Sequence, residues 1–174
     1  PGMLNAVGTE SSPITFTSFT GTSGGWGGIL FDNGSDNGDA VSTMDWCNVN
    51  RAGYLSTLGF EANMRCYLTS QPTISNCSFN GSAVDGLILD GYLGEISDSR
   101  ASLNQADGIV VQNSTITQLT RVEVSGNTDD GLTVANSPDL IVGGNAVSTC
   151  QLYGNDGYNL RVVAGTDTID AGYN

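Results

Sequence analysis

Hydrophobic and polar residues alternate in six short segments of the chain, and each segment begins with glycine. The segments share the form glycine, large, variable, large, and their glycines follow one another at intervals of 22 to 33 residues. Alternation with a period of two is typical of a β-strand that buries one face, so each segment predicts a strand of one shared parallel sheet. The six segments begin at Gly28, Gly53, Gly86, Gly108, Gly131 and Gly157.

A second alternating element precedes most of these glycines, as in ISNCSF (74–79), LTRVEV (119–124) and VSTCQL (147–152). Turn-forming Gly, Asn, Asp and Ser separate the elements, and no stretch shows the apolar stripe of a helix. A unit this short cannot enclose a core alone, so stacked units must bury a shared interior. The pattern predicts an all-β parallel β-helix of about six to seven rungs. An antiparallel sandwich is the alternative, but it does not explain why one phrase recurs in register.

Length and composition predict a single domain over residues 1–174, because 39% hydrophobic residues suffice for a continuous core. No apolar run approaches the roughly 18 residues of a membrane span, so we expect no membrane insertion. The chain begins with Pro1 rather than Met and shows no signal-peptide pattern. We therefore expect a segment of a longer protein or of a polymeric assembly.

The net charge of the chain limits the classes of molecule that it can bind. Eighteen acidic residues oppose five arginines, and the chain has neither His nor Lys, which gives a net charge of -13. Such a surface repels nucleic acid, and the lack of His excludes Ser-His-Asp and Cys-His catalysis as well as imidazole metal sites. Cations and neutral polymers such as polysaccharides are better candidates.

Three stretches resemble secreted bacterial right-handed parallel β-helix repeat proteins: LNAVGTESSPITFTS (4–18), GGWGGILF (24–31) and STMDWCNVNRAGY (42–54). The resemblance implies a right-handed coil and an extracellular or cell-surface location. Proteins of this kind include adhesins, surface-layer components and carbohydrate-active enzymes, so the resemblance indicates the fold more firmly than the function.

The segment NTDDG (127–131) offers either a glycosidase acid pair or a turn. Polygalacturonase-type hydrolases of this fold also need segments that contain His and Lys, which this chain lacks. One acid of the pair shares its place before a repeat glycine with acids of other units. We therefore expect a structural ladder, neutralised by backbone N–H groups or by a shared cation, at Asp85, Asp107, Asp130 and Asp156.

Pectate-lyase-type chemistry would need carboxylate-bound Ca²⁺ and an Arg or Lys base. Arg100, Arg121 and Arg161 lie in alternating strands with no acidic cluster in phase, so we interpret them as solvated residues of outward faces. No catalytic residue is assigned.

The densest acidic turn, residues 32–40, places Asp32, Asp36 and Asp39 among small residues. These carboxylates are candidate Ca²⁺ ligands, although the turn lacks the final Glu of an EF-hand loop. The alternative is a long solvated connection.

Cys47, Cys77 and Cys150 each stand two residues before an apolar residue, which predicts inward-facing free thiols, because stacked strands hold neighbouring Cβ atoms farther apart than a disulfide prefers. The pattern does not place Cys66. The Trp and Tyr side chains could stack on sugar rings, but packing in the core or against turns is the simpler interpretation.

These observations predict a non-catalytic extracellular structural module, either a rigid spacer or an adhesive segment. Adjacent rungs of the parent protein, or identical chains stacked head to tail into a filament, would cover its ends. The alternative is a carbohydrate-active domain of the polysaccharide lyase or glycoside hydrolase kind, or a polysaccharide-binding module. An enzyme should bring acids or an Arg together within about 10 Å in a groove, whereas a spacer should disperse its acids along the turns.

Overall fold

The computed structural model describes residues 2–32, 41–54, 61–67, 70–115, 117–163 and 169–171. The regular structure in these residues consists of short strands in three sheets, and every strand pair in the sheets is parallel. No helix in the described part of the chain could cross a membrane.

We call the sheets I, II and III, in the order in which the chain enters them. Sheet I contains β1 (Asn5–Val7), β4 (Thr43–Asp45), β7 (Thr73–Ser75), β10 (Glu95–Ser97), β13 (Gln118–Thr120), β16 (Leu140–Val142) and β19 (Ile169–Asp170). Sheet II contains β2 (Ile14–Thr17), β5 (Cys47–Asn50), β8 (Ser78–Asn80), β11 (Arg100–Ser102), β14 (Glu123–Ser125) and β17 (Gln151–Tyr153). Sheet III contains β3 (Ile29–Phe31), β6 (Ala62–Tyr67), β9 (Asp85–Asp90), β12 (Ile109–Gln112), β15 (Leu132–Ala135) and β18 (Leu160–Val163).

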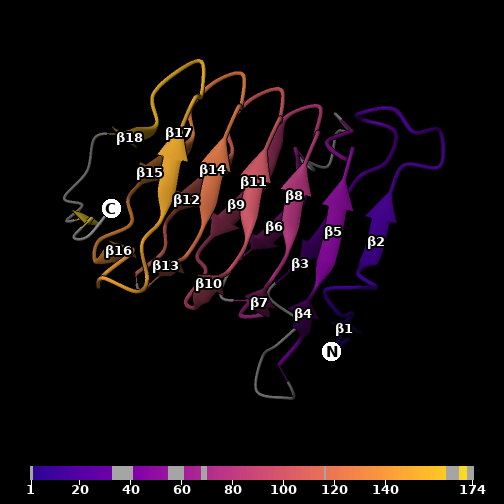
Figure 1. Cartoon of the computed structure of the whole chain (residues 1–174), viewed down its shortest axis with the longest axis horizontal. Coiled ribbons are helices and arrows are strands. Elements are labelled where there is room, and N and C mark those ends of the chain that lie inside the picture. Colours follow the sequence, from indigo (N-terminus) through magenta and orange to yellow (C-terminus); the bar gives the residue numbers. More distant parts are fainter. Residues whose placement is uncertain are drawn as a thin grey trace.

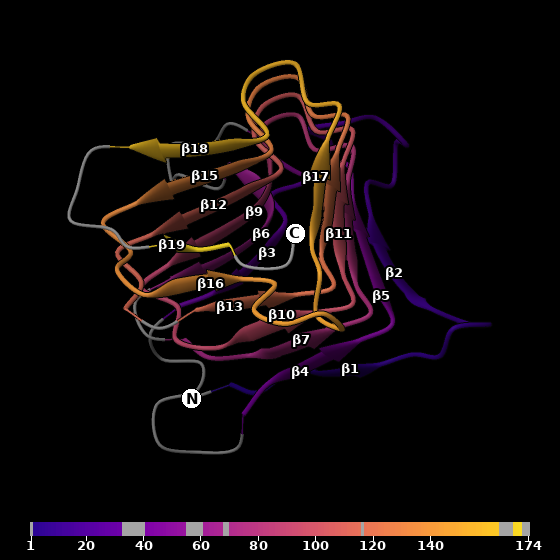
Figure 2. The same ribbon diagram turned by 60° about the vertical axis from the view of Figure 1, so that its left-hand side comes forward.

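Each turn of the coil, or rung, contributes one strand to each sheet, so the strands stack along the molecule (Figures 1 and 2). Sheet I holds seven strands and the other two sheets hold six each, which confirms the predicted parallel β-helix of six to seven rungs. The antiparallel sandwich is excluded by the parallel pairing.

The predicted glycine phrase matches sheet III in most rungs. Ile109 pairs with Leu87 on one side and Leu132 on the other, and all three side chains are buried in the core. Because inward residues stack like on like, a slip of one residue would expose the whole set.

Two of the six predicted strand starts are wrong. The strand of the second rung is β6, not a segment that follows Gly53, and Met64 of β6 pairs with Ile29 and Leu87. This register also places Cys66, which lies inward between Phe31 and Leu89.

In the last rung the strand begins at Leu160, three residues after Gly157, and Leu160 pairs with Leu132. The phrase GYNL (157–160) is therefore two residues out of step with its counterparts. The extra residues of this rung lie between β16 and β17, whereas the turn between β17 and β18 is as long as the turn between β14 and β15. Asp156 and Gly157 therefore stand two residues ahead of the places that Asp130 and Gly131 occupy.

Side chains that point into the coil form one continuous apolar core. Its largest members with almost no exposure are Tyr92, Phe79, Met44, Met64, Ile74, Leu87, Leu89, Ile96, Ile109, Leu119, Leu132 and Leu140. The four cysteines are free thiols and all are buried, so the predicted inward placement of Cys47, Cys77 and Cys150 is confirmed. Burial raises the pKa of the Cys77 thiol to about 12, which suits a core residue rather than a reactive one.

The corners of the coil depend on single residues in the left-handed conformation. At the first corner, between sheets I and II, the residues Trp46, Asn76, Asp98 and Arg121 have φ between 49° and 52°. One such residue redirects the backbone between two extended strands, at a cost of roughly 1 kcal/mol where the residue is not Gly, Asn or Asp. The first corner therefore presents one side chain per rung in a fixed direction.

Candidate functional site

Three aspartates at the second corner, between sheets II and III, form a column that we call the carboxylate column: Asp85, Asp107 and Asp130. Each accepts a hydrogen bond at its Oδ1 from a backbone N–H of the next rung. The N–H donors belong to Asp107 (2.9 Å), Asp130 (3.0 Å) and Tyr158 (2.7 Å), respectively. The predicted ladder of turn acids is confirmed for these three residues.

Asp156 does not join the column, contrary to prediction. The N–H that bonds to Asp130 is that of Tyr158, so Tyr158 takes the next place in the column. The reason is the register of the last rung, in which Leu160 pairs with Leu132, so that Asp156 lies two residues ahead of that place.

The column gathers further charge at its C-terminal end. One carboxylate oxygen from each of Asp107, Asp129 and Asp130 lies within 4.8 Å of the other two. Arg161 donates to Oδ2 of Asp130 at 3.1 Å, and the Thr133 hydroxyl lies 3.3 Å from the same oxygen. Arg161 is exposed, as predicted, but the expectation that it lacks an acidic partner is wrong, because β18 brings it beside an acid 31 positions earlier in the chain. The same expectation is wrong for Arg121, which pairs with Asp98.

The pKa values at the two ends of the column shift in opposite directions. Burial alone would raise the pKa of Asp130, but the Tyr158 N–H and the Arg161 guanidinium hold it below its ordinary value. At the other end, burial raises the pKa of Asp85 to about 7, and burial also raises the pKa of Asp107. The three column acids thus accept hydrogen bonds from the backbone of the next rung, at the corner between sheets II and III.

An asparagine ladder lies beside the column, and the sequence analysis missed it. Asn104 Nδ2 donates to Asn127 Oδ1 at 2.9 Å, and Asn127 Nδ2 donates to Asn155 Oδ1 at 2.8 Å. Each acceptor oxygen also binds the backbone N–H of the preceding ladder residue. The signal that could have revealed the ladder is an Asn three residues before the column Asp, as in NQAD (104–107) and NTDD (127–130).

A groove of about 450 Å³ runs along the first corner and the adjacent outer face of sheet II. It is lined by Glu10, Pro13, Trp46, Asn48, Asn76, Cys77, Ser78, Asp98, Ser99, Arg100, Arg121 and Glu123. The left-handed corner residues supply an indole, an amide, a carboxylate and a guanidinium from successive rungs. Hydrogen-bonding groups therefore line the groove across several rungs.

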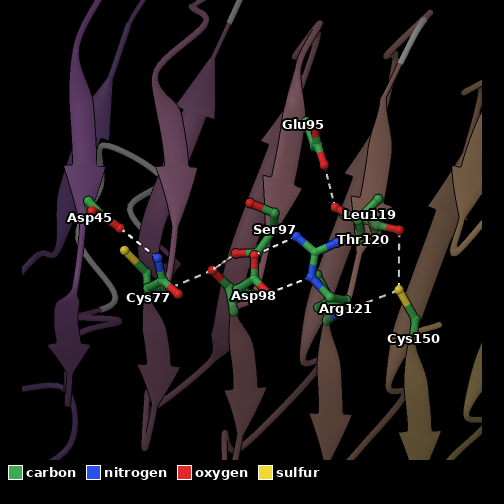
Figure 3. A network of polar contacts seen from close by, with 12 residues as sticks. Asp45, Cys77, Glu95, Ser97, Asp98, Leu119, Thr120, Arg121 and Cys150 are labelled. Carbon is green, nitrogen blue, oxygen red and sulfur yellow. Dashed lines mark hydrogen bonds and ion pairs between the residues drawn. The ribbon is translucent and has the colours of Figure 1, made fainter. Parts of the chain in front are cut away.

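The central acid of the groove is paired. Figure 3 shows Asp98 against the Arg121 guanidinium, with Arg121 Nε 2.5 Å from Oδ1 and Nη2 2.6 Å from Oδ2. The Arg121 guanidinium holds the pKa of Asp98 below its ordinary value, so Asp98 is ionised and has no proton to donate at neutral pH. Glu123, a second acid of the groove, accepts a hydrogen bond of 2.7 Å from the Tyr153 hydroxyl.

Arg100 is the arginine of the groove that could bind a ligand, because it takes part in no ion pair among the described residues. Arg100 is exposed and lies between Ser78 and Glu123 in the register of sheet II, as predicted for an outward residue. Among the described residues, neither Arg100 nor Arg51 takes part in an ion pair, whereas the other three arginines do. Arg51 lines a second hollow on the same sheet, together with Thr17, Asn50 and Asn80.

The predicted Ca²⁺ ligands are only partly described. Asp32 follows β3 and is exposed, and Asp36 and Asp39 lie outside the described residues. The metal site at this turn stays a prediction.

A family model described as a right handed beta helix region matches residues 5–171. The match spans all the strands described above and confirms the predicted right-handed coil. A search of curated proteins and a search of solved structures both found no match.

Proposed function

Because the chain belongs to the right-handed β-helix family, we propose that it is a non-catalytic structural or adhesive module of an extracellular or cell-surface assembly. The observation that carries this proposal is that its buried and groove-lining aspartates are occupied by structural contacts. The carboxylate column binds backbone N–H groups between rungs, and Asp98 is held by Arg121. Neither arrangement pairs a protonated acid with a free base across a substrate groove, as glycoside cleavage requires.

The groove of the first corner favours an additional role, which is to hold an extended polysaccharide chain. Its amides, hydroxyls and charged groups suit the hydroxyls of sugars, and Trp46 offers an aromatic surface. Rungs repeat at about 4.8 Å, which is close to the length of one pyranose residue in an extended glycan, so successive sugars would meet equivalent positions. The two arginines without an ion pair among the described residues, Arg100 and Arg51, line hollows along sheet II, where they could meet acidic groups of a polymer.

We expect the chain to bind a polysaccharide without cleaving it. Retention on immobilised neutral and acidic polysaccharides would measure binding, and release of reducing ends or unsaturated products from the same polymers would measure cleavage. Arg100→Ala should weaken retention about tenfold, because a charge-assisted hydrogen bond contributes on the order of 1.4 kcal/mol. Gln105→Ala, an exposed change at the second corner, is the control and should bind like the wild type.

Product release that Asp98→Asn abolishes without loss of thermal stability would reject the non-catalytic proposal. Equal retention of the wild type and Arg100→Ala would reject the groove as the binding site, while leaving the structural proposal in place.

The end rungs support a further part of the proposal, that other β-helical rungs cover them. In each sheet the terminal strand has one hydrogen-bonded neighbour among the described strands. The inward side chains Leu152 and Leu160 are only partly buried, whereas their partners Val124 and Leu132 are fully buried. Open strand edges beside exposed apolar side chains favour continued parallel pairing, either with rungs of the parent protein or with a second copy.

If second copies cover the ends, the contact is head to tail and does not close, so the product is a filament. Sedimentation of the isolated chain over a wide concentration range should then show mass that grows with concentration. Leu160→Arg should stop this growth, because it places a charge at the apolar end. A monomer at the highest concentration would contradict stacking of identical chains.

A further inference from the structure

We propose that the carboxylate column holds a proton in mildly acidic solution and that loss of this proton as pH rises loosens the central rungs of the β-helix. The inference goes beyond the structural and binding roles proposed above. It starts from the charges that face the column.

In the described part of the chain, the column and its charged neighbours together comprise five acids and one cation. The acids are Glu61, before β6, and the turn residues Asp85, Asp107, Asp129 and Asp130; the cation is Arg161 of β18. Backbone N–H groups donate to three of these carboxylates but carry no net charge. Like charges at rung spacing repel, so a proton on one acid relieves the column.

The contacts decide which end of the column carries the proton. Arg161 and Thr133 both approach Oδ2 of Asp130, so that carboxylate is the most stabilised as an anion. Asp85 lies two rungs away from Asp130 and faces the negative charges of Asp107, Glu61 and Asp129. Burial is the larger effect and raises the pKa of Asp85 to about 7, and burial raises that of Asp107 as well.

The sign of the pH dependence follows from these values. An Asp with an ordinary pKa of 3.8 in the unfolded chain and about 7 in the folded chain binds more protons in the folded state between these two values. The stabilisation that this proton contributes is therefore fully present below pH 3.8. It decreases as pH rises toward about 7 and does not change further above that value. Over the middle of this range, one fully retained proton changes the unfolding constant by about tenfold per pH unit.

The test compares chelator-treated wild-type protein with Asp85→Asn, by denaturant unfolding from about pH 4.5 to about pH 8.5. Asn keeps the Oδ1 acceptor for the Asp107 N–H and mimics a protonated carboxyl. We expect the unfolding constant of the wild type to rise with pH more steeply than that of Asp85→Asn. Asp98→Asn is the matched control, because it removes an exposed acid with a lowered pKa and should keep the wild-type slope in this range.

Carboxyl ¹³C NMR of the wild type provides a measurement that does not depend on the folding of any variant. A midpoint near 7 for Asp85 supports the proposal, and a midpoint near the ordinary Asp value overturns it. Equal slopes for the wild type and Asp85→Asn also overturn it.

Discussion

Replacing Asn127 with alanine is expected to lower the free energy of unfolding by at least about 3 kcal/mol. The Asn127 Oδ1 accepts the backbone N–H of Asn104 at 3.1 Å and its Nδ2 at 2.9 Å, and the Asn127 Nδ2 donates to the Ala101 carbonyl at 3.2 Å and to Asn155 Oδ1 at 2.8 Å. Alanine would remove these four hydrogen bonds and deprive the buried Asn104 N–H of its acceptor, and a buried group that loses its partner costs roughly 1 to 3 kcal/mol.

Denaturant unfolding monitored by circular dichroism would measure the loss. Asn145→Ala is the matched control, since Asn145 is exposed and its Oδ1 accepts only the nearby N–H of Val147. That change should stay within about 0.5 kcal/mol of the wild type. Similar losses for the two variants would mean that the ladder does not hold the rungs together.

Replacing Gly108 with alanine should destabilise the protein by about 3 kcal/mol. A Cβ at this position would lie 2.6 Å from Asn127 Nδ2 and 2.7 Å from the Gly131 carbonyl oxygen, and it would also contact the Val124 side chain. The carbonyl belongs to the hydrogen bond that Ile109 N–H donates to the next rung, so it cannot move away without breaking the sheet. The glycine of the repeated phrase is therefore required by its neighbour in the following rung.

Gly27→Ala is the control for this substitution, because a Cβ there meets no atom within 4 Å. Its stability should match that of the wild type or exceed it slightly, since alanine restricts the unfolded chain. Chemical denaturation would compare the two variants. Wild-type stability in Gly108→Ala would show that neighbouring rungs separate more easily than the contacts imply.

The fold could be predicted because its strongest determinant is visible in the sequence. Inward positions such as Leu87 and Leu89 alternate with outward ones, and the phrase repeats in register. The prediction failed where rung length changes. Gly53 begins a phrase without a second large residue, and Gly157 stands two residues ahead of the place that Gly131 occupies, so matching by glycine placed both strands wrongly.

The candidate site was harder to predict for two physical reasons. Asn104 and Asn127 have the composition of turn residues, and their sequence does not distinguish an exposed turn from a buried ladder. The residues of the first corner share a left-handed backbone conformation but no chemistry, so Trp46, Asn76 and Arg121 gave no repeating signal. Contacts between rungs, such as Arg161 with Asp130, depend on the residue count of the turn between them.

The spacing of the ladders has a consequence for how such a molecule changes in length. In the central rungs the column and the asparagine ladder both recur after 22 or 23 residues, as shown by the pairs Asp85 with Asp107 and Asn104 with Asn127. In the longer last rung both ladders recur after 28 residues instead, at Asn155 and Tyr158, so they stay in phase with each other. Duplicating a whole rung would keep both in phase and lengthen the rod by about 4.8 Å. The length of the rod can therefore increase in steps of one rung. Tandem duplication of rungs in the gene would produce rods of graded length with the same cross-section.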